Sequence, residues 1–195
     1  QDEELGLRLA AQECDCDFST SGNTVVHPEM LQFYRQTYMQ DPIEKRGFDS
    51  NLYVWEIPDY TKDYVVVADV ARGDGTDYSA FHVFDLEEAT QVAEYKGQVT
   101  TKDYGNMLVS ISTEYNDALL VIENANIGWA TIQQVIERGY KNLYYTPKDI
   151  GLDSDRYLAR ATDVQRTKDQ VAGFTMSSKV RPLIISKMEL YMREK

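Results

Sequence analysis

Two carboxylates that each close an apolar run are the residues of this sequence best suited to chemistry. Asp69 ends the run VVVAD, and Glu123 ends the run LLVIE. If these runs are neighbouring parallel strands, both side chains leave the sheet at the same carboxyl-end edge, where open α/β sheets place their sites. Carboxylate oxygens suit hard divalent cations such as Mg²⁺. The pattern therefore predicts a metal site that could serve phosphodiester hydrolysis, by activating water and stabilising the leaving oxygen.

A glycine-rich turn after the first of these acids adds two more, Asp74 and Asp77. An Asp in such a turn bonds its side chain to the following backbone amides, which explains Asp74 and is an equal alternative for Asp69. Asp77 is less easily explained in this way and stays a candidate ligand. The stretch is not an EF-hand, because Ala80 stands at the twelfth position, and it lacks the G-K-[ST] of a P-loop.

The composition is that of a folded protein with an acidic surface. The chain has 195 residues, 43% of them hydrophobic, and a formal net charge of −12, which suits one main domain with a substantial core. We expect a soluble, intracellular protein, because no apolar run approaches a membrane span and the first residues lack the features of a signal peptide. Cys14 and Cys16 are too few for a four-ligand zinc site. The charge disfavours a broad nucleic-acid footprint but leaves room for a local basic strip.

The strands that would position the acids follow from the apolar pattern. Residues 64–70, 79–85 and 91–98 are strand-like runs separated by short turns, which predicts an antiparallel meander. The first run is apolar on both faces, so we expect it in the centre of the sheet with both faces covered. Four further segments follow in the order helix, strand, helix, strand: residues 101–115, 118–123, 127–138 and 142–146. This order predicts an α/β fold with a mixed central sheet flanked by helices.

Two more helices are expected near the ends of the sequence. Residues 28–38 have near-helical apolar spacing, and Pro182 suits the first turn of a second helix. We expect the apolar stripe of the first helix in the core: Met30, Leu31, Phe33, Tyr34 and Tyr38. Residues 148–178 are polar with little periodicity and are interpreted as a long loop region.

Three blocks, in their order and spacing, resemble the nuclease domain of the large terminase subunit of tailed, T4-like bacteriophages. They are VVVADVARGDGTDYSAFHVFDL, LLVIENANIG and KVRPLIISKMELYMRE. The upstream stretch QECDCDFSTSGNTVV resembles the segment where the ATPase domain of that protein gives way to the nuclease. The resemblance implies that residues 1–24 are a remnant of the inter-domain linker or the end of the ATPase domain. It implies that residues 25–195 are an RNase H-like nuclease domain, truncated at its C-terminus, with helices on both faces of the sheet.

The resemblance also implies a reaction. That family cuts concatemeric viral DNA during packaging into a procapsid, with Mg²⁺ or Mn²⁺ held by acidic residues, two ions in the complete domain. Asp69 matches the catalytic aspartate of the first strand, Glu123 the glutamate that closes the fourth, and Asp77 the acid after the glycine-rich turn. The family's third core acid comes from a segment after the R-P-L helix, beyond Lys195. We therefore expect weak activity or none from this fragment.

The implied partners are double-stranded DNA and, in the full-length protein, the portal and the small terminase subunit, with no membrane. The implied location is the cytoplasm of the infected bacterial host, at the procapsid portal. Basic side chains that could contact phosphates, or equally be solvated loop residues, are Arg72, Lys148, Arg156, Arg160, Arg166 and Lys168.

Two other functions are considered beside a nuclease. One is a non-catalytic RNase H-like interaction module that docks to the portal or to other packaging proteins, which the acidic composition and the missing third acid favour. The other is an actin-like phosphotransferase, which is disfavoured because the sequence has no second glycine-rich phosphate loop.

Overall fold

The structure is a computed structural model that describes residues 25–26, 28–147 and 170–194. It contains two compact units, one spanning Asp41–Met176 and the other formed by the described parts of Gln1–Gln40 and Ser177–Lys195. No helix within these described ranges has the length and hydrophobicity needed to cross a membrane. The predicted residues that lie outside the described ranges are Cys14, Cys16, Lys148, Arg156, Arg160, Arg166 and Lys168.

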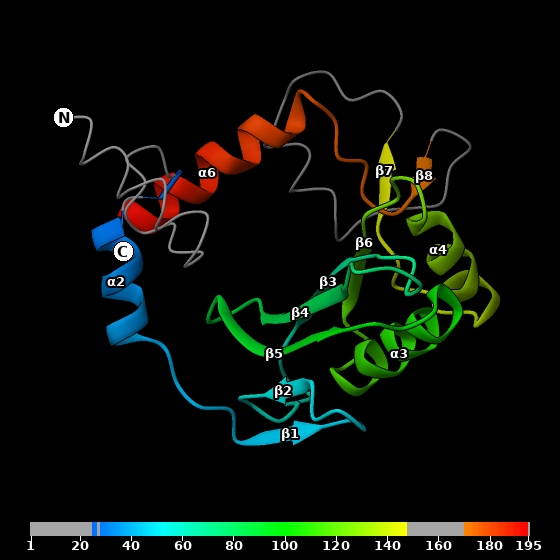
Figure 1. Cartoon of the computed structure of the whole chain (residues 1–195), viewed down its shortest axis with the longest axis horizontal. Coiled ribbons are helices and arrows are strands. Elements are labelled where there is room, and N and C mark those ends of the chain that lie inside the picture. The colour runs from blue at the N-terminus through cyan, green and yellow to red at the C-terminus, as the bar shows by residue number, and fades with distance from the viewer. Residues whose placement is uncertain (1–24, 27, 148–169, 195) are drawn as a thin grey trace. The chain divides into compact units, whose positions relative to one another are not determined.

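A six-stranded mixed sheet forms the centre of the unit Asp41–Met176 (Figure 1). Its strands lie in the spatial order β1 (Glu44–Arg46), β2 (Leu52–Val54), β5 (Thr90–Gly97), β4 (Ser79–Asp85), β3 (Tyr64–Asp69) and β6 (Leu119–Ile122). β3, β4 and β5 form an antiparallel meander, and β6 pairs with β3 in parallel. The predicted meander, the mixed sheet and the central place of β3 are therefore confirmed.

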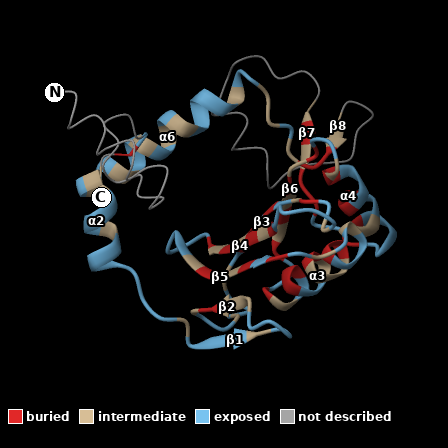
Figure 2. Ribbon diagram, in the orientation of Figure 1, coloured by how far each residue is buried: buried red, intermediate tan, exposed pale blue. Residues whose placement is uncertain are grey.

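Two helices cover one face of this sheet, α3 (Thr101–Glu114) and α4 (Gly128–Glu137). α3 begins at Thr101, the first residue of the predicted helix. Thr100 caps it, because the Thr100 hydroxyl accepts a hydrogen bond from the Asp103 amide at 3.2 Å. α4 ends just before Gly139, whose φ of +76° suits a glycine after a helix. Figure 2 shows buried residues on the strands and on parts of both helices. α3 crosses over from β5 to β6, so the sheet and its helices share one core.

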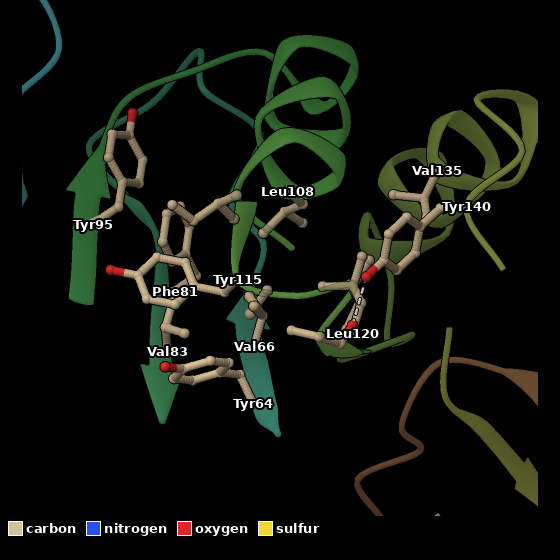
Figure 3. Close-up of a cluster of buried hydrophobic side chains, with 14 of the residues drawn as sticks. Tyr64, Val66, Phe81, Val83, Tyr95, Leu108, Tyr115, Leu120, Val135 and Tyr140 are labelled. Carbon is tan, nitrogen blue, oxygen red and sulfur yellow. Dashed lines mark hydrogen bonds between the residues drawn. The ribbon is translucent and has the colours of Figure 1, made fainter. Parts of the chain in front are cut away.

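Aromatic rings fill the centre of that core (Figure 3). The ring of Phe81 stacks on Tyr95 and on Tyr104, with centroids 5.4 and 6.4 Å apart. Two other buried tyrosines reach backbone acceptors: Tyr115 donates to the Glu56 carbonyl at 2.8 Å, and Tyr140 donates to the Ala118 carbonyl at 2.5 Å. Burial raises the pKa of both hydroxyls, so they remain donors. These bonds let the core use tyrosines where smaller apolar residues would leave space.

The segment after α4 differs from the prediction. Residues 142–146 do not form a further strand of the main sheet; β7 (Tyr145–Pro147) pairs instead with β8 (Gln170–Ala172) in a separate two-stranded sheet. Contact with β6 is limited to isolated parallel bridges, from Leu143 to Leu120 and from Phe174 to Glu123. Two short segments thus share the edge of β6 that one strand was expected to occupy. β8 also lies in the stretch expected to be loop.

The second face of β3 is less covered than the sequence predicted. Val66 is fully buried, whereas Val67 is 43% exposed. Because α3 and α4 lie on the same face, no described helix of this unit covers the other one. The expectation that β3 is covered on both faces is therefore wrong for the described residues. Consecutive valines are apolar on both sides of a strand, so the residue types alone did not indicate which side is packed.

The second unit contains α2 (Pro28–Thr37) and α6 (Val180–Glu194). The predicted core role of the α2 stripe is wrong, since no residue of either helix is buried and Phe33 is 47% exposed. The Tyr34 hydroxyl donates to the Met192 carbonyl at 3.2 Å, which joins the two helices. The physical reason is that the apolar stripe of a helix is buried only where other elements pack on it, and one packed helix leaves much of the stripe exposed.

Truncating the core side of α3 should destabilise the protein strongly. Leu108 is fully buried, so Leu108→Ala is expected to lower the free energy of unfolding by about 2 to 5 kcal/mol. Thr113→Ala, on the exposed side of the same helix, should change it by less than about 0.5 kcal/mol. Urea unfolding followed by circular dichroism measures both, and equal effects would contradict the packing of α3 on the sheet.

A buried ion pair should make the stability depend on acidic pH. The fully buried Asp85 accepts from Lys62 at 2.6 Å and from the amides of Glu87 and Glu88 at 2.8 and 3.1 Å. The Lys62 hydrogen bond is the main cause that lowers the pKa of Asp85. This carboxylate therefore stabilises the fold above its unfolded pKa of about 3.9 and loses that effect as the pH falls below it.

Asp85→Asn should consequently lower the urea midpoint at pH 7, and the difference from the unsubstituted protein should shrink as the pH falls toward 3. A difference independent of pH would show that the charge of Asp85 does not contribute.

Candidate functional site

The parallel pairing of β3 and β6 places the two predicted acids at one edge of the sheet. The register runs from Val65 opposite Leu119 to Ala68 opposite Ile122. Asp69 and Glu123 come next on their strands, and the Glu123 amide donates to the Ala68 carbonyl at 3.2 Å. The predicted parallel arrangement is confirmed, and both carboxylates follow the last paired residues of adjacent strands.

The two acids differ in how they are held. Asp69 is exposed, and its Oδ1 accepts from the Val70 amide at 2.9 Å. This is the local bond that the turn interpretation expected, and it involves one carboxylate oxygen. Glu123 is half-buried, because the chain at Phe174 runs along the other side of β6. The Phe174 amide donates to the Ile122 carbonyl at 2.7 Å, so Glu123 is held from both sides of its strand.

Asn124 supports this edge and was not singled out from the sequence. Its buried side-chain amide donates to the Ala172 carbonyl at 3.0 Å and to the Thr175 hydroxyl at 2.9 Å. A Cβ on Gly128 would meet the Glu123 carbonyl oxygen at 2.0 Å, so α4 starts directly against the backbone of the acid. The one feature of the sequence that could have indicated Asn124 is its position directly after Glu123. Its partners come from far along the chain, which local pattern cannot show.

The glycine-rich loop after Asp69 is held against the connection between β5 and α3. Gly73 has a φ of +80°, and a Cβ there would lie 2.2 Å from the Val99 carbonyl oxygen. The Gln98 side-chain amide donates to the Gly75 carbonyl at 2.8 Å. At the base of the loop, the Ala71 amide donates to the Ser79 hydroxyl at 3.0 Å. The loop is therefore positioned by backbone contacts on both of its arms.

An open pocket of about 720 Å³ lies between the loops that follow the two acids. It is lined by residues 70–77 of the glycine-rich loop together with Asn126 and Ile127 from the turn after Glu123. Arg72 and Asp77 both line this pocket, and both are exposed. A guanidinium in a pocket lined by the loops that follow the two acids is suited to a phosphate-containing ligand.

The three predicted ligands do not form one cluster. Within the described ranges, no group of three His, Cys, Asp or Glu side chains is arranged to hold a metal ion. Asp69 and Glu123 share the sheet edge, while Asp77 lies farther out in the loop. Two carboxylates with oxygen donors fit a hydrated Mg²⁺ or Mn²⁺, which fills its other positions with water and phosphate oxygens.

Solved structures of phage terminase nucleases are similar to this chain. The large terminase nuclease from thermophilic phage G20c with bound magnesium aligns over 89% of this chain and 72% of its own, with a TM-score of 0.60 and 20% identity. Another structure of the G20c nuclease aligns over 80% of this chain and 66% of its own, with a TM-score of 0.55 and 21% identity. The nuclease domain of the Thermus phage P74-26 large terminase gives 80% and 64% coverage, a TM-score of 0.53 and 21% identity.

Other structures of the G20c nuclease contain cobalt or zinc. No protein-family model matches the chain, and no curated protein matches it in sequence. At these identities the similarity shows the fold: the chain has the RNase H-like architecture of these nuclease domains, as the sequence predicted. The chain spans 64% to 72% of the lengths of the three matched structures.

A side chain at Gly73 should disturb the loop that lines the pocket. Gly73→Ala combines a positive φ with a contact to the Val99 carbonyl, so it should cost about 1 to 3 kcal/mol in unfolding free energy. Gly75→Ala is the matched control, because a Cβ there meets no atom within 4 Å. Urea unfolding and limited proteolysis compare the two, and equal behaviour would contradict the close packing of residue 73.

Proposed function

We propose that this chain is the nuclease part of a large terminase subunit of a tailed, T4-like phage. It would be a divalent-metal-dependent endonuclease that cuts concatemeric viral DNA during packaging. The observation that supports this most is the placement of Asp69 and Glu123 at the ends of paired parallel strands. We assign residues 25–195 to the RNase H-like nuclease domain, and residues 1–24 to the inter-domain linker or the end of the ATPase domain.

In this proposal, Asp69 and Glu123 hold Mg²⁺ or Mn²⁺ at the sheet edge. Such ions, when bound, activate water and stabilise the leaving oxygen of a phosphodiester. The chain itself orients the reacting phosphate: the two carboxylates leave adjacent strands in fixed register, and Arg72 offers a guanidinium to non-bridging phosphate oxygens. Asp77, in the wall of the same pocket, is assigned an auxiliary role in positioning.

The substrate in this proposal is double-stranded DNA. The portal and the small terminase subunit would be partners of the full-length protein, in the cytoplasm of the infected host at the procapsid portal. Among the residues that the structure describes, two acids share the sheet edge, and a third carboxylate would strengthen metal binding. We therefore expect this chain to nick DNA slowly and to bind its metal weakly.

A second candidate function is a non-catalytic RNase H-like module that docks to the portal or another packaging protein. The lack of a three-carboxylate group among the described residues favours it. Mn²⁺ binding measured by electron paramagnetic resonance separates the two functions. A nuclease should bind Mn²⁺ in a way that Asp69→Asn abolishes, whereas a docking module should bind no more Mn²⁺ than that variant does.

Removing either acid of the pair should strongly reduce metal-dependent nicking. Asp69→Asn and Glu123→Gln are each expected to reduce Mn²⁺-dependent nicking of supercoiled plasmid at least about tenfold, because each removes a ligand. Asp117→Asn is the control: it neutralises an exposed acid just before β6, at the opposite end of that strand from Glu123. Agarose gel electrophoresis measures the nicked fraction. Nicking that resists both substitutions at the pair would overturn the proposed nuclease.

A further inference from the structure

Lys96 lies in the same row of the sheet as Asp69. Asp69 of β3 pairs with Ala80 of β4, and Ala80 pairs with Lys96 of β5. Directly paired residues project from the same face of a sheet, so all three side chains leave the face opposite α3. With strands about 4.8 Å apart, the Lys96 backbone is roughly 10 Å from that of Asp69.

The row between these residues is not filled by a large side chain. Ala80 lies between the carboxylate and the lysine in this row, and its side chain is only a methyl group. The next residue of β4 on the same face is His82, which has a much larger side chain. The row of side chains from Asp69 to Lys96 therefore begins at an acid and ends at a cation.

The ammonium group of Lys96 lies over the aromatic ring of Tyr78. The Lys96 ammonium lies 5.0 Å from the centroid of the Tyr78 ring, and Tyr78 directly follows Asp77 in the chain. A cation–π contact orients the ammonium but does not neutralise its charge. Lys96 comes from β5 and thus contacts the residue that directly follows the pocket-lining loop.

Glu94, the acid nearest to Lys96 along β5, interacts with other side chains. Glu94 accepts from the Gln91 side-chain amide at 2.8 Å and lies 3.6 Å from Nδ1 of His82. Over the described ranges, no ion pair includes Lys96. Within the described part of the chain, no carboxylate therefore pairs with this ammonium.

We propose that Lys96 contacts a backbone phosphate of the DNA that the acid pair would cut. This assignment rests on the proposed nuclease function and extends it to a second phosphate. A separation of roughly 10 Å is short enough for the acid pair and Lys96 to engage different phosphates of one DNA strand. Lys96 would thus bind the DNA strand within a few nucleotides of the reacting phosphate. This contact would help to position the duplex on the sheet face opposite α3. The sequence did not reveal it, because a lone lysine in a strand resembles any exposed residue.

Binding of a labelled duplex of about 30 base pairs to the 195-residue chain, measured by fluorescence anisotropy in EDTA, tests this contact without metal or cleavage. Lys96→Gln should weaken binding about fivefold to tenfold at 0.1 M salt and reduce the slope of log affinity against log salt by about 0.9. Lys96→Arg should retain both values. Lys141→Gln is the matched control, because Lys141 is exposed in the loop beside the start of β6, away from the acids.

Each result decides the assignment. If Lys96→Gln and Lys141→Gln bind alike, the phosphate contact is overturned, while the nuclease proposal still depends on the nicking assay with Asp69→Asn. If the unsubstituted chain binds no duplex, the phosphate contact is overturned, and the nicking assay alone decides the nuclease proposal. If the slope changes as expected but nicking is insensitive to Asp69→Asn, Lys96 is a DNA contact on a protein that is not this nuclease.

Discussion

The parallel pairing of β3 with β6 is the interaction on which the rest of this structure depends. Parallel neighbours need a crossover connection, and α3 supplies it between β5 and β6. The crossover brings the apolar side of α3 onto the sheet, where Leu108 and the aromatic rings around Phe81 are buried. The same pairing aligns the strand ends, so one set of backbone hydrogen bonds determines both the core and the separation of the two acids.

The loops at that edge are shaped by backbone contacts. At Gly73 and at Gly128, the space that a side chain would occupy is taken by a carbonyl oxygen, of Val99 in one case and of Glu123 in the other. Each glycine lets one segment approach another closely. The glycine-rich loop is therefore positioned by the backbone at Val99, and the start of α4 by the backbone at Glu123. A pocket walled by such loops can keep its shape while exposing Arg72 and Asp77.

The sheet separates stability from the proposed chemistry. One face packs on α3 and α4 and contains the buried cluster, whereas the other keeps Val67, Asp69 and Lys96 at least partly exposed. Substitutions on the exposed face should therefore change ligand binding without a large cost in folding, which makes the acid pair and the lysine accessible to experiment. The buried ion pair of Asp85 with Lys62 lies at the far end of β4 from Ala80 and stabilises the turn after that strand.

Several features of this protein follow from its sequence alone. Alternation and apolar runs predicted the meander, the two core helices and a strand ending at Glu123, because strand and helix periodicity are local properties. The position of Asp69 and Glu123 after such runs placed both acids at strand ends. The RNase H-like fold was implied by the resemblance of the quoted blocks to a known nuclease family.

Only the tertiary structure decided what depends on distant contacts. It showed that β3 is packed on one face, that the stripe of α2 is not buried, and that the segment after α4 pairs with β8. Asn124 and Lys96 were not identified from the sequence. The hydrogen-bond partners of Asn124 come from a distant part of the chain, and Lys96 reaches the row of Asp69 only through strand pairing. The physical reason is common to all of these: residue types determine which local structures can form, but burial and neighbourhood depend on which elements the register brings together.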